Sequence, residues 1–169
     1  MSPAGPPGSG LPAYVGIGAN LGDARATVAA AGQALAALPH SRLVALSSVY
    51  RSAPIDAAGP DFFNAVACLH THLPAAALLA ELQGIERAFG RERPYRHAPR
   101  TLDLDLLLLG DEVVNSPDLT VPHPRLHQRA FVLQPLLELN PALAAPGLGA
   151  LARWLPATAD QPIQRLPGP

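Results

Sequence analysis

Two aspartates separated by a single leucine, Asp103 and Asp105, lie in the stretch Arg100–Gly110, which reads RTLDLDLLLLG. Side chains on a β-strand alternate between its faces, so a strand here places both carboxylates on one face, with Cα atoms roughly 6.5–7 Å apart. The same alternation predicts that four leucines share the opposite face: Leu102, Leu104, Leu106 and Leu108. Aspartate is rare in strands, and two like charges side by side repel. A divalent cation, or a pair of them, would remove that repulsion.

A simpler interpretation is an amphipathic strand whose two aspartates only meet solvent. The preceding segment 91–100 favours a functional role, because it contains four arginines stiffened by two prolines. Guanidinium groups offer planar, paired donors to phosphate oxygens. An arginine-rich loop, an acidic strand and metal ions together indicate phosphoryl transfer, in which catalysis consists mostly of positioning and charge neutralisation. Two metals can also hold the attacking and leaving oxygens of an in-line displacement.

A second group of residues is suited to binding a flat heterocycle. Phe62 and Asn64 share a strand face, so an aromatic ring stands beside an amide. The ring supplies stacking area and the amide supplies hydrogen bonds. The alternative, a core position for the phenylalanine, is the commoner fate of such a ring. Further along the chain, His123, Arg129 and Phe131 add an imidazole, a guanidinium and another ring.

Composition excludes several classes of protein. The chain has 169 residues and a net charge of -1, which does not indicate a binder of nucleic acid. All twelve basic residues are arginine, so a P-loop, which needs Gly-Lys-Ser/Thr, and Schiff-base chemistry on lysine are both excluded. No apolar run approaches the roughly 20 residues of a membrane helix. The absence of a secretory signal and the single Cys68 predict a cytoplasmic protein without an intrachain disulfide.

The hydrophobic pattern predicts strands at 13–18, 43–51, 64–71 and around the aspartate pair, with a short extra strand at 112–115. Helices are expected from the turn at 20–23 to about residue 38, from Pro74 to Gly90, and over 130–139. The order β-α-β-β-α-β indicates an α+β, ferredoxin-like sandwich, an antiparallel sheet with helices packed on one face. Residues 13–155 would form this domain, with a disordered Pro/Gly-rich lead-in at 1–12 and an irregular Pro-rich tail at 156–169.

The motifs, in this order, resemble the 6-hydroxymethyl-7,8-dihydropterin pyrophosphokinases of folate biosynthesis over about residues 13–141. The resemblance rests mainly on Gly18-Ala-Asn20-Leu-Gly22, Phe62-Phe63-Asn64-Ala65, Pro99-Arg100-Thr-Leu-Asp103-Leu-Asp105 and Val121-Pro122-His123. It implies a monomeric enzyme that transfers a pyrophosphoryl group from ATP to the hydroxymethyl oxygen of the pterin and releases AMP. Neither nucleic acid nor membrane is an expected partner.

The resemblance also implies a role for each matching residue. Asp103 and Asp105 would hold two Mg²⁺ ions. The expected catalytic residues are Arg91, Arg96 and Arg100. ATP would contact Arg91, Arg100, Leu106, Leu119, Thr120, His123 and Arg129. The pterin would contact Ser52, Ala53, Ile55, Phe62, Asn64 and Phe131. The sequence departs from the family pattern at His97-Ala98, where Trp-Gly is common, and at Pro124, where some members have tyrosine.

Two other functions use some of the same features. A two-metal phosphohydrolase or nuclease would use the same aspartates, but it would need an activated water and, for a polymer, a basic track. A non-catalytic ferredoxin-like module would bind a small ligand or RNA without needing metal, and for RNA it would need aromatic residues along a strand.

Overall fold

The computed structural model describes residues 10–53, 59–90 and 102–167. Its principal elements are β1 (Leu11–Ala19), α1 (Ala24–Ala36), β2 (Ser41–Leu46), β3 (Tyr50–Ser52), β4 (Phe62–Thr71), α2 (Ala75–Gly90), β5 (Asp103–Leu109), α3 (Ala130–Leu139), the 3-10 helix η1 (Leu151–Thr158) and β10 (Gln164–Arg165). Two short hairpins complete it: β6 (Val114–Asn115) with β7 (Thr120–Val121), and β8 (Ala144–Ala145) with β9 (Gly149–Ala150).

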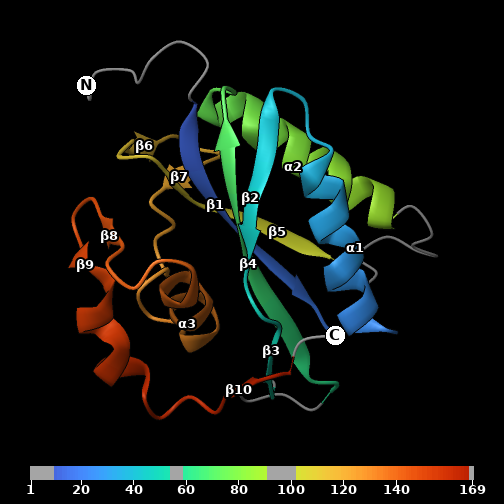
Figure 1. The fold of residues 1–169 in the computed structure, drawn as a ribbon, viewed down its shortest axis with the longest axis vertical. Coiled ribbons are helices and arrows are strands. Elements are labelled where there is room, and N and C mark those ends of the chain that lie inside the picture. Colours follow the sequence, from blue (N-terminus) through green and yellow to red (C-terminus); the bar gives the residue numbers. More distant parts are fainter. Residues whose placement is uncertain (1–9, 54–58, 91–101, 168–169) are drawn as a thin grey trace.

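The main sheet is antiparallel and runs in the order β10-β3-β4-β1-β5, with β2 also paired to β4 (Figure 1). Because β2 and β3 pair with opposite ends of β4, they act as one interrupted strand. The resulting arrangement, β5-β1-β4-(β2/β3), confirms the predicted ferredoxin-like class.

The single strand expected at 43–51 is broken in its middle. At the break, the Ser47 hydroxyl accepts a hydrogen bond from the Val66 backbone N–H at 2.9 Å, in place of a backbone carbonyl. The pairing of β2 with β4 has already shifted register between Leu43 and Ala45. Because the Ser47 side chain replaces a backbone partner here, the strand is interrupted, and β3 turns toward α3 and β10.

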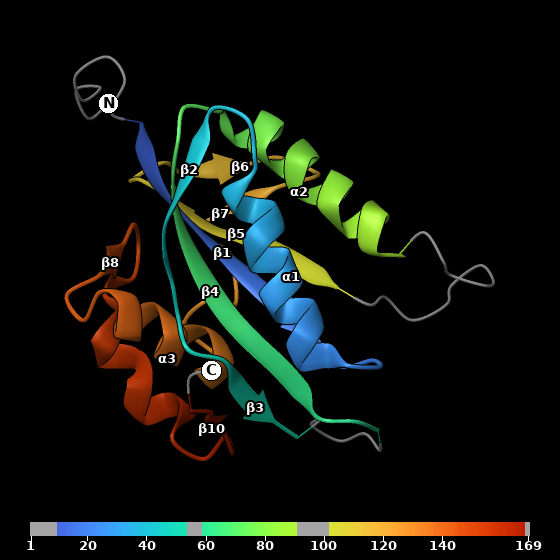
Figure 2. The same cartoon turned by 45° about the vertical axis from the view of Figure 1, so that its right-hand side comes forward.

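Helices α1 and α2 cover one face of the sheet (Figure 2). Asp23 begins α1 by accepting a hydrogen bond from the Ala26 N–H at 3.2 Å, as an N-cap does. Val28, Ala31 and Leu35 of α1 are buried against the sheet, and Leu78 and Leu82 of α2 are fully buried in the same core.

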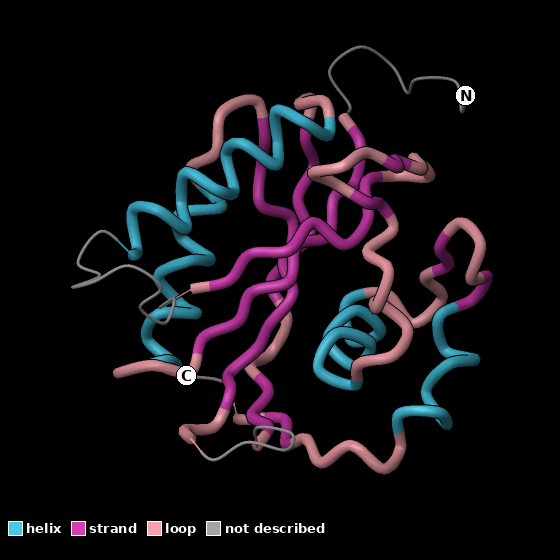
Figure 3. Tube along the Cα trace, turned by 180° about the vertical axis from the view of Figure 1, so that it is seen from behind, coloured by secondary structure: helices cyan, strands magenta, loops and turns pink. Residues whose placement is uncertain are grey.

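The other face is covered in part by α3 and η1 (Figures 1 and 3). Val132, Leu133 and Leu136 of α3 belong to a second core with Val66 of the sheet and with Cys68, the single thiol. The part of this face that α3 leaves uncovered borders the cavity described below.

Strand β5 changes faces after its acidic half. Its pairing with β1 passes from Leu106 opposite Val15 to Leu108 opposite Tyr14, which leaves Leu107 as an extra residue. An inserted residue exchanges the two faces of everything beyond it. The prediction that Leu108 shares a face with the preceding alternate leucines is therefore wrong: Leu108 lies in the core under α3.

The chain also contributes more structure near its two ends than expected. Leu11 and Pro12, assigned to the lead-in, belong to β1. The irregular tail expected from residue 156 is wrong for the described residues, because η1 extends to Thr158 and β10 pairs with β3. A strand of two residues that pairs with a distant segment has no hydrophobic periodicity by which the sequence could predict it.

No helix in the described ranges has both the length and the apolar character needed to cross a membrane.

Candidate active site

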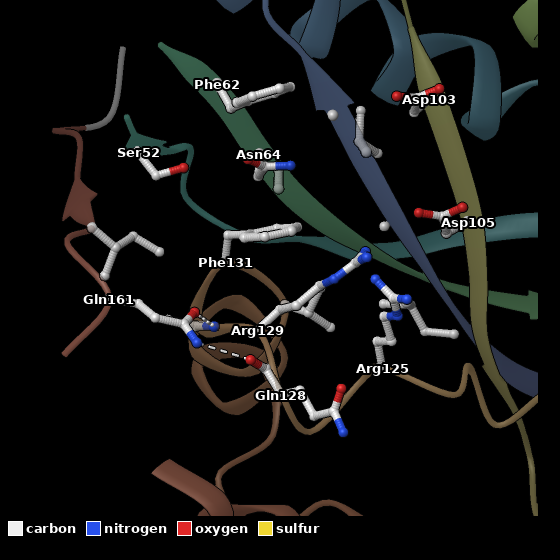
Figure 4. Close-up of a pocket in the computed structure, with 18 of the residues that line it drawn as sticks. Ser52, Phe62, Asn64, Asp103, Asp105, Arg125, Gln128, Arg129, Phe131 and Gln161 are labelled. Atoms are coloured by element: carbon white, nitrogen blue, oxygen red, sulfur yellow. Dashed lines mark hydrogen bonds between the residues drawn. The ribbon is translucent and has the colours of Figure 1, made fainter. Parts of the chain in front are cut away.

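A cavity of about 460 Å³ opens on the sheet face next to the start of α3 (Figure 4). Its walls come from β1, β3, β4, β5, the turn before α3, the first residues of α3 and the segment just before β10. Elements from across the whole chain therefore meet at one place, and the acidic pair lies at one end of it.

Asp103 and Asp105 both line the cavity, while Leu104 between them is buried in the helix-side core. The predicted alternation of the acidic half of β5 is thus confirmed. The residues paired with the two aspartates on β1 are Gly18 and Gly16. Because glycine has no side chain, β1 leaves the carboxylates accessible from the cavity.

Two guanidinium groups extend toward Asp105, from Arg125 and Arg129 (Figure 4). Arg129 was predicted as a site residue and Arg125 was not. Positive charge at this end offsets the repulsion between the carboxylates and offers paired donors to an oxyanion.

His123 lies beside this charged group. Its backbone N–H bonds to the Leu107 carbonyl at 2.9 Å, which places it at the outer edge of β5. The Nδ1 atom of His123 accepts a hydrogen bond from the backbone N–H of Arg125 at 3.1 Å. The proton of the neutral ring therefore resides on Nε2. Burial lowers the pKa of His123, and the positive charges of Arg129 and Arg125 act in the same direction, while Asp105 opposes them. At neutral pH the imidazole is an uncharged hydrogen-bond donor.

The other end of the cavity is a slot between two aromatic rings. Figure 4 shows Phe62 and Phe131 on either side of an opening, with the Asn64 amide between them. Asn64 is only 9% exposed, and its Oδ1 is buried without a hydrogen-bond partner among the described residues. An unsatisfied buried acceptor costs about 1–3 kcal/mol, so this atom is suited to a ligand that donates to it.

Gly18 is required beside this amide. A Cβ atom at Gly18 would lie 2.8 Å from Asn64 Nδ2, closer than side chains tolerate. Ser52 and Ala53, which are predicted to contact the pterin, lie at the end of β3 and line the same cavity. The ring slot and the charged end are therefore continuous.

Besides His123, which lies beside the charged end without lining the cavity, three predicted ATP contacts lie outside it. Leu106 and Leu119 pack in the helix-side core, and Thr120 is exposed on β7, next to β5. Their assignment to adenine stays a prediction. The predicted residues Arg91, Arg96, Arg100 and Ile55 lie outside the described residues.

The prediction missed several cavity residues: Arg125, Gln128, Gln161, Pro162 and Ile163. Arg125 lies only two positions after His123, and this spacing could have indicated that it belongs to the same site. Nothing in the local sequence of 161–163 signals a cavity wall.

Glu138 on α3 holds β3 and β10 against the helix. It accepts from the Tyr50 hydroxyl at 2.7 Å and from the Ser48 N–H and hydroxyl at 2.9 and 3.0 Å, with Arg165 at 3.4 Å. Burial alone would raise the pKa of Glu138, but the hydrogen bonds from Tyr50 and Ser48 and the Arg165 charge lower it overall. Burial and the same hydrogen bond raise the pKa of Tyr50.

We expect Glu138→Gln to lower the free energy of unfolding at pH 7 by about 1–3 kcal/mol, because hydrogen bonds to a charged group are lost. A lowered folded-state pKa gives stability that is complete above the ordinary value of 4.5 and is lost as the pH falls through the folded value. The difference between wild type and variant should therefore shrink below pH 4.5. Urea unfolding at pH 7, 5 and 3.5 measures it, and a gap that stays constant down to pH 3.5 would contradict this account.

Taken together, the fold and the cavity describe a phosphate-handling enzyme built on a ferredoxin-like sheet, with one end for charged oxygens and the other for a flat ring. The model of the 7,8-dihydro-6-hydroxymethylpterin-pyrophosphokinase (HPPK) family matches residues 14–141. The chain belongs to this family.

Two curated pyrophosphokinases match this chain over nearly their whole length. A 2-amino-4-hydroxy-6-hydroxymethyldihydropteridine pyrophosphokinase from Pseudomonas aeruginosa is 46% identical over 156 residues, which cover 92% of this chain and 96% of the relative. One from Haemophilus influenzae is 39% identical over 92% of this chain and 98% of its own.

Solved structures support the fold. An HPPK-DHPS structure in complex with substrates superposes with a TM-score of 0.69 over 88% of this chain, at 11% identity. A Plasmodium falciparum HPPK-DHPS structure gives 0.67 over 85%. This chain spans only 43% and 42% of those two longer chains. At this low sequence identity, the likeness shows only that the fold is shared.

Proposed function

We propose that this protein transfers the pyrophosphate group of ATP to 6-hydroxymethyl-7,8-dihydropterin, giving the pterin diphosphate and AMP, a step of folate biosynthesis. Family membership supports the reaction. The observation that carries it at the level of this chain is one continuous cavity, which joins an acidic pair and two guanidinium groups to a two-ring slot with a buried, unpartnered amide oxygen.

In this proposal the pterin lies between Phe62 and Phe131, and Asn64 bonds its polar edge. Stacking in such a slot fixes the plane of the ring, and the amide fixes its rotation within that plane. The hydroxymethyl group is then directed toward the charged end. Holding the attacking oxygen in line with the phosphorus supplies much of the rate enhancement, since the reaction needs little covalent chemistry from the protein.

The donor set fits Mg²⁺. Asp103 and Asp105 provide hard carboxylate oxygens, and Mg²⁺ in nucleotide sites is commonly held by one or two carboxylates together with substrate phosphates. No cluster of three or more His, Cys, Asp or Glu side chains suited to a metal occurs among the described residues. The triphosphate would therefore complete the coordination. Bound Mg²⁺ would neutralise charge on the phosphate oxygens.

The side chains around the pair would bind the rest of the polyphosphate. We assign phosphate contacts to Arg129 and to neutral His123 through Nε2–H. Arg91, Arg96 and Arg100 stay predictions as catalytic residues, as do Leu106, Leu119 and Thr120 as neighbours of the adenine. Cytoplasmic location and a monomeric state likewise stay predictions.

The test is to incubate the protein with ATP, Mg²⁺ and 6-hydroxymethyl-7,8-dihydropterin and to follow the products by phosphorus NMR and chromatography. We expect AMP and the pterin diphosphate in equal amounts. A phosphohydrolase would instead consume ATP without the pterin, and a binding module would release no AMP. Either result would overturn the proposal.

A further inference from the structure

One wall of the cavity comes from a part of the chain that the family model does not reach. The match to the family model ends at residue 141, yet Gln161, Pro162 and Ile163 line the cavity. This segment lies next to Arg129, at the end of the turn that leads into α3 and its Phe131 (Figure 4).

The Gln161 side chain bridges the backbone on both sides of Arg129. Its Oε1 accepts from the Ala130 N–H at 2.8 Å, and its Nε2 donates to the Gln128 carbonyl at 2.9 Å. One amide thus pairs with a donor and an acceptor that flank a single residue. This paired bond fixes the orientation of the peptide groups that precede and follow Arg129.

Backbone hydrogen bonds hold the start of α3, from the Gln128 N–H to the Arg125 carbonyl at 3.0 Å and from the Leu133 N–H to the Arg129 carbonyl at 2.9 Å, but its N-cap side chain adds none. Arg129 occupies the N-cap position in an extended conformation, φ −125° and ψ 117°, and its side chain makes no capping hydrogen bond. A helix leaves its first N–H groups unsatisfied, and a side chain at the N-cap usually satisfies one of them. Arginine has no acceptor atom and cannot cap these N–H groups, and here the Gln161 amide oxygen satisfies the Ala130 N–H from a distant part of the chain. The Arg129 guanidinium lies 5.5 Å from the centre of the Phe131 ring.

The segment that carries Gln161 is itself anchored to the sheet. Beyond it, β10 pairs with β3 through the backbone, and the Leu166 N–H donates to the Val49 carbonyl at 2.8 Å. Because β3 ends at Ser52 in the cavity, the segment ties two walls of the site together.

We propose that Gln161 is a positioning residue for the transfer reaction: its bridge across Arg129 sets the angle between the ring slot and the charged end, so that the pterin oxygen and the polyphosphate meet in line. This inference rests on the proposed function, in which Phe131 stacks on the pterin and Arg129 contacts phosphate. It assigns a catalytic consequence to a residue that touches neither reacting atom.

The test compares Gln161→Ala with Gln164→Ala. Both variants remove a glutamine amide from the same segment, but the exposed hydrogen bond of the Gln164 side chain is made with Arg51 on β3 and leaves the backbone pairing of β10 in place. We measure kcat, the KM of each substrate, the dissociation constant of 6-hydroxymethyl-7,8-dihydropterin in the presence of a non-hydrolysable ATP analogue, and Tm. For Gln161→Ala we expect kcat to fall by about tenfold or more and the pterin to bind several-fold more weakly, because small displacements of aligned groups cost rate steeply. Gln164→Ala should stay within twofold of wild type in kcat and in pterin affinity.

A second variant, Gln161→Glu, keeps the acceptor for the Ala130 N–H but removes the donor to Gln128. A carboxylate at a helix N-terminus favours folding, so this variant answers the question if the alanine variant does not fold. We expect kcat to fall here as well. If every folded Gln161 variant keeps kcat and pterin affinity within twofold of Gln164→Ala, the inference is overturned.

Phe131→Leu and Arg129→Ala separate this inference from the one on which it rests. If neither change affects pterin binding or turnover, the assignment of the site itself is wrong. If both do and the Gln161 variants do not, the positioning role alone is wrong.

Discussion

Asp105→Asn is expected to lower the rate of AMP release by about a thousandfold while leaving pterin affinity within about threefold of wild type. The substitution keeps the size of the side chain and removes its charge, so one carboxylate no longer holds Mg²⁺ against the triphosphate. Metal ions stabilise phosphoryl transition states by several kcal/mol, and about 4 kcal/mol corresponds to a thousandfold in rate. The pterin is bound at the ring slot, which the substitution leaves intact.

A coupled AMP assay and calorimetry with the pterin measure the two quantities separately. Asp111→Asn is the matched control, since Asp111 is exposed in the turn that follows β5 and does not line the cavity. Chelation of Mg²⁺ should stop wild-type turnover, and added Mg²⁺ should restore it. Equal loss of pterin binding and turnover in Asp105→Asn would count against a metal role for the acidic pair.

Asn64→Ala is expected to weaken pterin binding by about a hundredfold with little loss of stability. Hydrogen bonds at a buried site contribute about 1–1.5 kcal/mol each, and 1.4 kcal/mol is a factor of ten in affinity, so losing two gives this figure. The stability of the unliganded protein should change little, because Oδ1 is buried without a partner among the described residues and its removal relieves a cost. Most substitutions of buried residues do not separate binding from stability in this way.

Urea unfolding without ligand and a pterin titration measure the two effects. Asn115→Ala on β6 is the control, since it removes an exposed amide from a strand outside the cavity. If Asn64→Ala destabilised the free protein by 3 kcal/mol or more, Asn64 would be a structural residue and its assignment to the pterin would fail.

The parts of the site that could be predicted from sequence are those in which one local rule decides the geometry. Alternation along a strand placed Asp103 with Asp105 and Phe62 with Asn64, and both pairs share a face in the structure. The order of strands and helices was sufficient for the fold class, because few topologies fit that order.

The sequence predictions fail where contacts between distant segments determine the local geometry. In the run Leu106–Leu109 every residue is leucine, so nothing in the sequence identifies Leu107 as the extra residue that exchanges the faces. The break at Ser47 depends on a hydroxyl bonding to Val66, and the wall at Gln161 depends on pairing with distant backbone groups. Each of these contacts joins segments far apart in the chain, which local periodicity does not report.

The thiol under α3 gives this protein its own reporter of motion at the site. Cys68 is 7% exposed and lies in the core that α3 covers, against which Phe131 also packs. Burial raises the pKa of this thiol, which a hydrogen bond with Tyr14 only partly offsets, so the closed protein presents an unreactive sulfhydryl. We therefore expect a thiol reagent to label Cys68 at a rate limited by local opening of this core. Since α3 also carries Phe131, one ring of the slot, we expect the labelling rate to report on opening of this wall of the cavity without any engineered probe.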